Sequence, residues 1–120
     1  MPHTTFHDVR TWSRSCDVAV HVYRVLNELR DRNFADRVIQ NAFKIPEEVA
    51  AALNPCRDAN RYDALSRSLE ALTILQTQLY LASECGLLAA EHMNAICTEA
   101  ADLSADLQSQ QGADPRTVNT

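Results

Sequence analysis

The sequence contains very little glycine. Among its 120 residues there are only two glycines, Gly86 and Gly112, and four prolines, whereas Ala, Leu, Glu, Gln and Arg are abundant. Because the glycines are 26 positions apart, the chain has no glycine-rich loop of the kind that cradles phosphate groups. A composition rich in helix formers favours long helices joined by few turns. The sequence therefore predicts an all-α fold.

The chain also lacks a long apolar run and a paired-cysteine motif. No stretch approaches the roughly 18 apolar residues of a membrane span, and the opening MPHTTFHDVR lacks the pattern of a signal peptide. We therefore expect a cytoplasmic protein that does not contact membranes. The cysteines stand far apart without a C-x-x-C pair, which argues against a zinc knuckle or a dithiol redox site and predicts free thiols. They are Cys16, Cys56, Cys85 and Cys97.

Motifs of catalysis and metal binding are missing as well. Di-iron bundles need inward-facing Glu-x-x-His pairs, and the sequence contains none. His3 and His7 have the i, i+4 spacing of a metal pair, but no third ligand stands near them, so their role stays open. No nucleophile is accompanied by a base and an orienting group. We therefore expect a non-enzymatic protein without cofactor or metal.

Four segments carry apolar residues at spacings of three and four, which is typical of amphipathic helices. We expect the first to run from a cap at Thr5 to about Arg30, and the second to end at Asn54 and Pro55. The third should begin after Asn60 and end at Gly86 as a left-handed cap. The fourth should span about 89–110. This pattern predicts one domain, residues 1–110, folded as an antiparallel up-down four-helix bundle, followed by a disordered tail, residues 111–120.

The first predicted helix has more apolar residues than packing against one neighbouring helix requires. Its regular stripe predicts that Trp12 and Tyr23 lie in the core, along with Val9, Cys16, Ala19 and Leu26. A second stripe lies beside it, and two residues of the third helix, Ile74 and Leu81, lie off that helix's main face. Apolar side chains that stay exposed to water do not contribute the stability that their burial would give. We therefore interpret these additional apolar residues as a candidate oligomer interface. Its residues are Val18, Val22, Val25, Leu29, Ile74 and Leu81.

Pro46 interrupts the second predicted helix. One interpretation is that a new helix begins there, with Glu47 and Glu48 near its positive end. The other is a single helix kinked at Pro46, where the ring removes the bond to the Ala42 carbonyl. The spacing continues unbroken from Ala42 through Ile45 to Val49, so we favour the kink and expect the latter two side chains to face the core.

Charge is divided unevenly along the chain, whose net charge is −5. Up to Arg67 there are ten basic and nine acidic residues, whereas the remainder has one basic and seven acidic residues. Acidic residues are interleaved with the cations of the first two helices, which favours a solvated mixed-charge face over a nucleic-acid surface. The candidate nucleic-acid contacts are Arg10, Arg14, Arg24, Arg30, Arg32, Arg37 and Lys44.

Three short stretches resemble a known family, the four-helix bundles that include the 23S rRNA intervening-sequence proteins and are related to the accessory variability proteins of diversity-generating retroelements. The stretch FHDVRTW resembles that family's F-x-x-L-x-x-W start, and Tyr23 stands where its first helix has a tyrosine. KIPEEVAA is similar to its S-I-P-x-N-I-A-E segment, and LQTQLYLASECGLL to its L-E-T-Q-L helix and glycine turn.

The resemblance implies a proline within the second helix, a homopentameric ring, and RNA or a reverse transcriptase as partners. Together with the absence of catalytic motifs, it leads us to expect a self-associating bundle that acts through protein–protein contacts. The alternative is an RNA-binding or reverse-transcriptase accessory protein of a retroelement or rRNA intervening sequence. A ring requires that one patch meets a different patch on the next subunit, and the uneven charge of the two halves suits such a contact.

Overall fold

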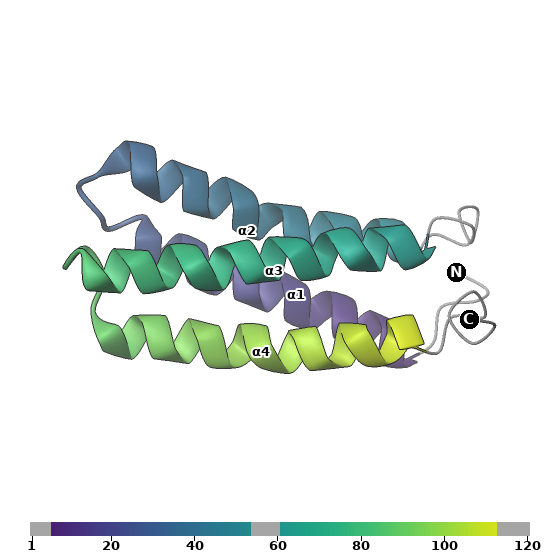
Figure 1. Ribbon diagram of the computed structural model, residues 1–120. Helices are drawn as coiled ribbons and strands as arrows, with labels where there is room; N and C mark the ends of the chain where they lie inside the picture. The colour runs from purple at the N-terminus through teal and green to yellow at the C-terminus, as the bar shows by residue number, and fades with distance from the viewer. Residues whose placement is uncertain (1–5, 54–60, 113–120) are drawn as a thin grey trace.

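Four α-helices form a bundle in the computed structural model, which describes residues 6–53 and 61–112. They are α1 (Phe6–Leu26), α2 (Arg32–Ala52), α3 (Arg61–Glu84) and α4 (Ala90–Gly112). Consecutive helices run in opposite directions, and the α1–α2 and α3–α4 connections lie at the same end (Figure 1). Each helix contacts two neighbours, in the cycle α1–α2–α3–α4–α1. The predicted all-α, antiparallel four-helix bundle is confirmed.

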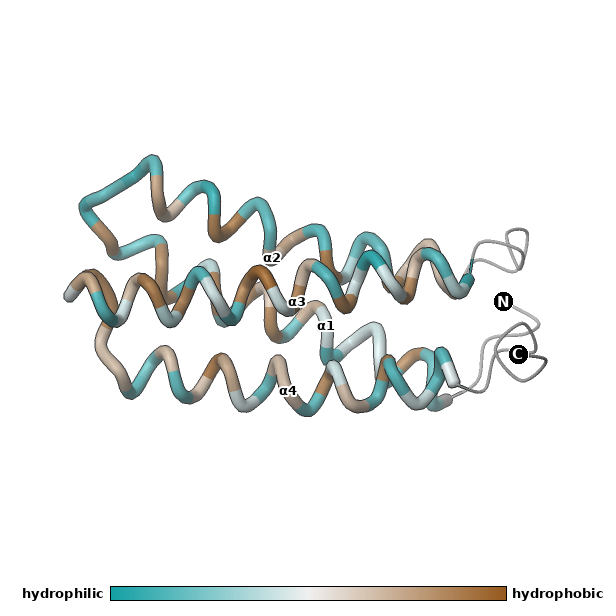
Figure 2. Tube along the Cα trace, in the orientation of Figure 1, coloured by the Kyte–Doolittle hydropathy of each residue, from teal (hydrophilic) through white to brown (hydrophobic). Residues whose placement is uncertain are grey.

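The core runs the length of the bundle and contains the apolar stripes of all four helices. On α2, hydrophobic residues face α3 while hydrophilic residues cover the outer side (Figure 2). Four leucines of α3 are buried as the spacing predicts, Leu69 is partly buried, and α4 contributes every fourth or third residue from Ile96 onward. The largest fully buried side chains of α3 and α4 are Leu65, Leu72, Leu75, Leu79, Ile96, Leu103 and Leu107.

Helix α2 passes through Pro46 without interruption. It begins after Asp31, whose side chain accepts a hydrogen bond from the backbone N–H of Phe34 at 3.1 Å and so caps the first turn. Ile45 and Val49 are both buried, at 0% and 1% exposure. The prediction of one continuous helix with these two residues in the core is confirmed, and a separate helix starting at Pro46 is ruled out. The bend at Pro46 stays a prediction.

Gly86 ends α3 as predicted. Its φ of 75° lies in the left-handed region that a side chain disfavours. The backbone N–H of Leu87 donates to the Ala82 carbonyl at 2.9 Å, and that of Gly86 donates to the Ser83 carbonyl at 3.1 Å. These two bonds define a Schellman cap. The turn positions Leu88, 6% exposed, over the end of the core.

Two predicted boundaries differ from the structure. Helix α1 ends at Leu26 rather than near Arg30. Helix α4 continues past Gln110 to Gly112, because the Gln111 side chain donates to the Ser66 hydroxyl (2.5 Å) and the Tyr62 carbonyl (3.3 Å) of α3. The rest of the predicted tail lies outside the described residues, as do the predicted cap and boundary residues Thr5, Asn54, Pro55 and Asn60. Among the described helices, none has the length and hydropathy of a membrane span.

Candidate functional site

The outer side of α1 carries large apolar side chains in contact with solvent. Val9, Trp12, Val20 and Tyr23 are 50%, 42%, 41% and 46% exposed, and Phe43 of α2 is 41% exposed. The Tyr23 and Phe43 rings lie 6.4 Å apart between centroids and are inclined at 56°, a favourable geometry for an aromatic pair. These five residues are called the α1–α2 apolar face below. Monomeric proteins rarely expose a large apolar patch without an interaction to cover it.

The α1–α2 apolar face exists because α1 turns a partly polar side toward the core. Thr11 and Ser15 are 1% and 0% exposed. The Thr11 hydroxyl donates to Asp106 Oδ2 at 2.7 Å and accepts from Gln110 Nε2 at 3.0 Å, both on α4. The Ser15 hydroxyl donates to the Trp12 carbonyl at 2.6 Å. Because these two hydroxyls make their hydrogen bonds in the interior, their side of α1 faces the core, and Trp12 lies on the side exposed to solvent.

The apolar spacing therefore predicted the core side of α1 only in part, because Ala19 and Leu26 are buried as expected but their large aromatic neighbours in the same stripe are not. Val18 and Val22, predicted to form a free oligomer interface, are 2% and 0% exposed and belong to the core of the single chain. Trp12 and Tyr23, predicted in the core, are exposed. The prediction failed because a count of apolar residues passes over buried hydroxyl groups. A search that allowed Thr and Ser in the core would have found the unbroken spacing of Thr11, Ser15, Val18, Val22 and Leu26.

The other predicted interface residues fall into two groups. Val25 and Leu29 are partly buried and pack against the core, so they offer little free surface. Ile74 and Leu81 are 44% and 50% exposed on α3, which confirms that they lie off its main face. Seven positions apart on one helix, they share one side. We call these two residues the α3 apolar patch.

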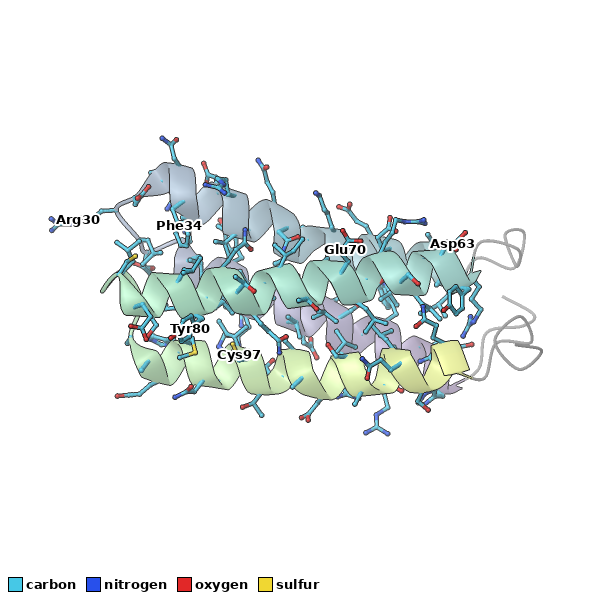
Figure 3. All side chains as sticks on the ribbon, viewed as in Figure 1. Arg30, Phe34, Asp63, Glu70, Tyr80 and Cys97 are labelled. Atoms are coloured by element: carbon cyan, nitrogen blue, oxygen red, sulfur yellow. The ribbon has the colours of Figure 1, made fainter. Side chains whose placement is uncertain are left out.

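The cations predicted to contact nucleic acid are not gathered on one surface. Arg14 lies between α1 and α4, with Nη1 3.8 Å from Asp106 Oδ2. Arg32 donates to the Asn27 and Leu29 carbonyls at 3.0 and 3.2 Å and pairs with Asp36 at 3.1 Å. Five others are exposed, and Arg30 projects from the end of the bundle (Figure 3). These five are Arg10, Arg24, Arg30, Arg37 and Lys44.

Histidines of α1 reach carboxylates of α4. His7 Nε2 is 2.9 Å from Asp106 Oδ1, and His21 Nδ1 is 2.5 Å from Glu99 Oε2. Over residues 6–53 and 61–112, no group of three His, Cys, Asp or Glu side chains could hold a metal ion. His3, the proposed companion of His7, lies outside the described residues. The His7–Asp106 and His21–Glu99 contacts connect α1 to α4.

Three of the four cysteines lie within the described residues, and all three are free thiols, as predicted. Burial raises the pKa of the Cys16 thiol above its ordinary value of 9.0, and the neighbouring carboxylate of Asp17 raises it further. Burial also raises the pKa of the Cys97 thiol. A raised pKa lowers the thiolate fraction at neutral pH, so neither thiol is set up as a nucleophile. Cys56 lies outside the described part of the chain.

Comparison with known proteins adds no relative. The chain matches no model of a protein family, and a search of curated proteins finds no match. The resemblance in FHDVRTW and KIPEEVAA therefore stays a hypothesis.

Proposed function

We propose that this chain is a non-enzymatic, self-associating bundle that acts through protein–protein contacts as a homopentameric ring. The observation that carries the proposal is the α1–α2 apolar face, in which five large apolar side chains, three of them aromatic, are each at least 41% exposed. Exposed Tyr and Trp are enriched at protein interfaces, where they contribute large contact area. Covering this face with protein would remove its apolar area from water.

A ring needs two different patches that fit one another. The α3 apolar patch, Ile74 and Leu81, is the second patch in this proposal. Helix spacing places the carboxylates of Glu70 and Glu84 next to it, and places Arg24 one turn from Val20 on the α1–α2 apolar face. Opposite charges around two apolar centres favour contact between the two patches and disfavour contact of either patch with itself.

Charge insertion into each patch tests the proposal. Tyr23→Glu and Leu81→Glu each place a carboxylate at an exposed position, so both variants should remain helical by circular dichroism and show a smaller mass by native mass spectrometry. Ala101→Glu is the matched control, because Ala101 is exposed on α4, away from both patches. A wild-type chain that is monomeric at micromolar concentration, or assemblies that survive both substitutions, would refute the proposal.

The second candidate function is single-stranded RNA binding, favoured by the exposure of aromatic residues on α1. Trp12 and Tyr23 are exposed, and the cations Arg10 and Arg24 are exposed on the same helix, as in a surface that stacks bases and contacts phosphates. Trp12 is the single tryptophan, so its fluorescence reports on this surface directly. Quenching by single-stranded RNA at physiological salt would support this candidate, whereas quenching confined to low salt indicates nonspecific phosphate contact.

A further inference from the structure

A cavity lies between α2 and α3, away from the α1–α2 apolar face. Its volume is about 340 Å³, within the range of small-molecule sites. It is lined by Asn41, Lys44, Glu48, Arg67, Glu70, Ala71 and Ile74. Figure 3 shows Glu70 on α3, next to the line where that helix meets α2.

Asn41 brings an unused hydrogen-bond acceptor to the cavity. The residue is only 8% exposed, and its Nδ2 donates to the Ala71 carbonyl at 3.0 Å and to Gln78 Oε1 at 3.3 Å. Because a backbone carbonyl can only accept, the atom facing it must be the amide nitrogen, which fixes the orientation of the side chain. No donor among the described residues is paired with Asn41 Oδ1. A buried carbonyl oxygen without a partner is costly, so a donor from outside the chain would be stabilised there.

Two charges on opposite walls of the cavity are also unused. Glu48 of α2 and Arg67 of α3 form an ion pair across the helices. Lys44 and Glu70 have no such partner within the described residues. They present an ammonium group on α2 and a carboxylate on α3, on the two sides of one opening. Ala71 and Ile74 supply an apolar surface beside them.

We infer that this cavity binds a small zwitterion of the amino-acid class with an apolar side chain. The carboxylate of the ligand pairs with Lys44, and its ammonium group donates to Asn41 Oδ1 and pairs with Glu70. The apolar side chain lies against Ala71 and Ile74. Each unused group of the cavity then has a partner of matching chemistry, and the ligand needs both of its charges. The cavity shares Ile74 with the α3 apolar patch but has no residue in the α1–α2 apolar face, so binding measured in the Tyr23→Glu variant, which is expected not to assemble, tests the inference separately from self-association.

Nuclear magnetic resonance of the full chain tests the inference through the Asn41 side-chain amide. The probes are L-leucine, L-methionine and L-phenylalanine at up to about 10 mM, where even a millimolar site is nearly saturated. We expect at least one probe to shift the Asn41 amide signal in a saturable way. For L-leucine, two analogues separate the charges: 4-methylpentanoate lacks the amine and 3-methylbutylamine lacks the carboxylate. Each should bind at least about tenfold more weakly than the amino acid, as expected when a charged contact is lost.

Two charge-neutralising variants complete the test. Lys44→Gln should weaken binding about tenfold, the loss expected of one charge-assisted contact. Arg37→Gln, the matched control on α2, removes an exposed charge that does not line the cavity and should leave binding unchanged. Absence of any saturable shift, meaning that water alone meets Asn41 Oδ1, overturns the inference. Equal weakening by the two variants also overturns it.

Discussion

Two opposite seams of the bundle, α2–α3 and α1–α4, are built from different chemistry. Where α2 meets α3, contact is most extensive, and the seam is largely apolar, with the buried amide of Asn41 and the Glu48–Arg67 ion pair as polar contacts across it. Where α1 meets α4, contact is least extensive, and polar groups cross the seam at Thr11, Asp106 and Gln110. The His21–Glu99 contact extends that polar character toward the far end of α1. One seam is held mainly by apolar burial and the other partly by hydrogen bonds.

The polar seam determines which side of α1 faces outward. The bond from Thr11 to Asp106 requires α1 to turn its hydroxyl side toward α4. In that orientation Trp12 and Tyr23 are left in solvent. The proposed interaction surface is therefore a consequence of how α1 is attached, and substitutions in the two seams should have distinct effects.

The largest effect is expected in the apolar seam. Leu75 of α3 is 0% exposed, so Leu75→Ala removes buried methyl groups and leaves a cavity. We expect a loss of about 2–5 kcal/mol in the free energy of unfolding, measured by urea denaturation followed by circular dichroism. Leu81→Ala is the matched control at an exposed site of the same helix and should change the value by about 0.5 kcal/mol or less in the monomer. Similar losses for the two leucines would contradict the observed packing.

A smaller effect is expected in the polar seam. Asp106→Ala removes the charged acceptor of the Thr11 hydroxyl, which retains only the His7 carbonyl at 3.0 Å, and it also removes the partner of the His7 side chain. We expect the free energy of unfolding to fall by about 1–3 kcal/mol. The decrease should be smaller when Thr11→Val is already present. A double-mutant cycle measures the difference, which should be a coupling of about 0.5–3 kcal/mol. Simple additivity would show that the bond between α1 and α4 contributes no stability.

The smallest effect is a difference in thiol reactivity. Burial raises the pKa of Cys16 and of Cys97, whereas Cys85 is exposed. With Cys56 replaced by serine, iodoacetamide at pH 7.5 should label Cys85 first. Raising the pH above 9 increases the thiolate fraction at Cys16 and Cys97 and should reduce the difference in labelling rate between them and Cys85. Mass spectrometry of peptides follows each site, and equal rates at neutral pH would contradict the burial of Cys16 and Cys97.

Much of the fold can be predicted from the sequence, because three helices follow simple rules. In α3 and α4 the buried positions are leucine, isoleucine or alanine at regular spacing, apart from Ser68, and Gly86 marks a turn by its backbone freedom. In α2 the register through Pro46 is sufficient to predict continuity. The exposed positions Ile74 and Leu81 could be predicted because the main face of α3 is unambiguous.

The site on α1 could not be predicted from apolar spacing. Helix α1 has two rows of apolar residues that are equally regular. Which row faces the core depends on long-range hydrogen-bond partners such as Asp106 and Gln110, which are about a hundred positions away in sequence. The cavity beside Asn41 has no sequence signal either, because it depends on which atoms of the amide are already bonded to α3.

The most direct test of the central claim combines native mass with Trp12 fluorescence across a dilution series of the wild-type chain. If the α1–α2 apolar face is covered by self-association, the emission of Trp12 should shift to longer wavelength as the assembly dissociates into monomers. Tyr23→Glu should show the monomer mass and the long-wavelength emission at every concentration, while Ala101→Glu should follow the wild type. A wild-type chain that is monomeric throughout, with unchanging Trp12 emission, would contradict the claim.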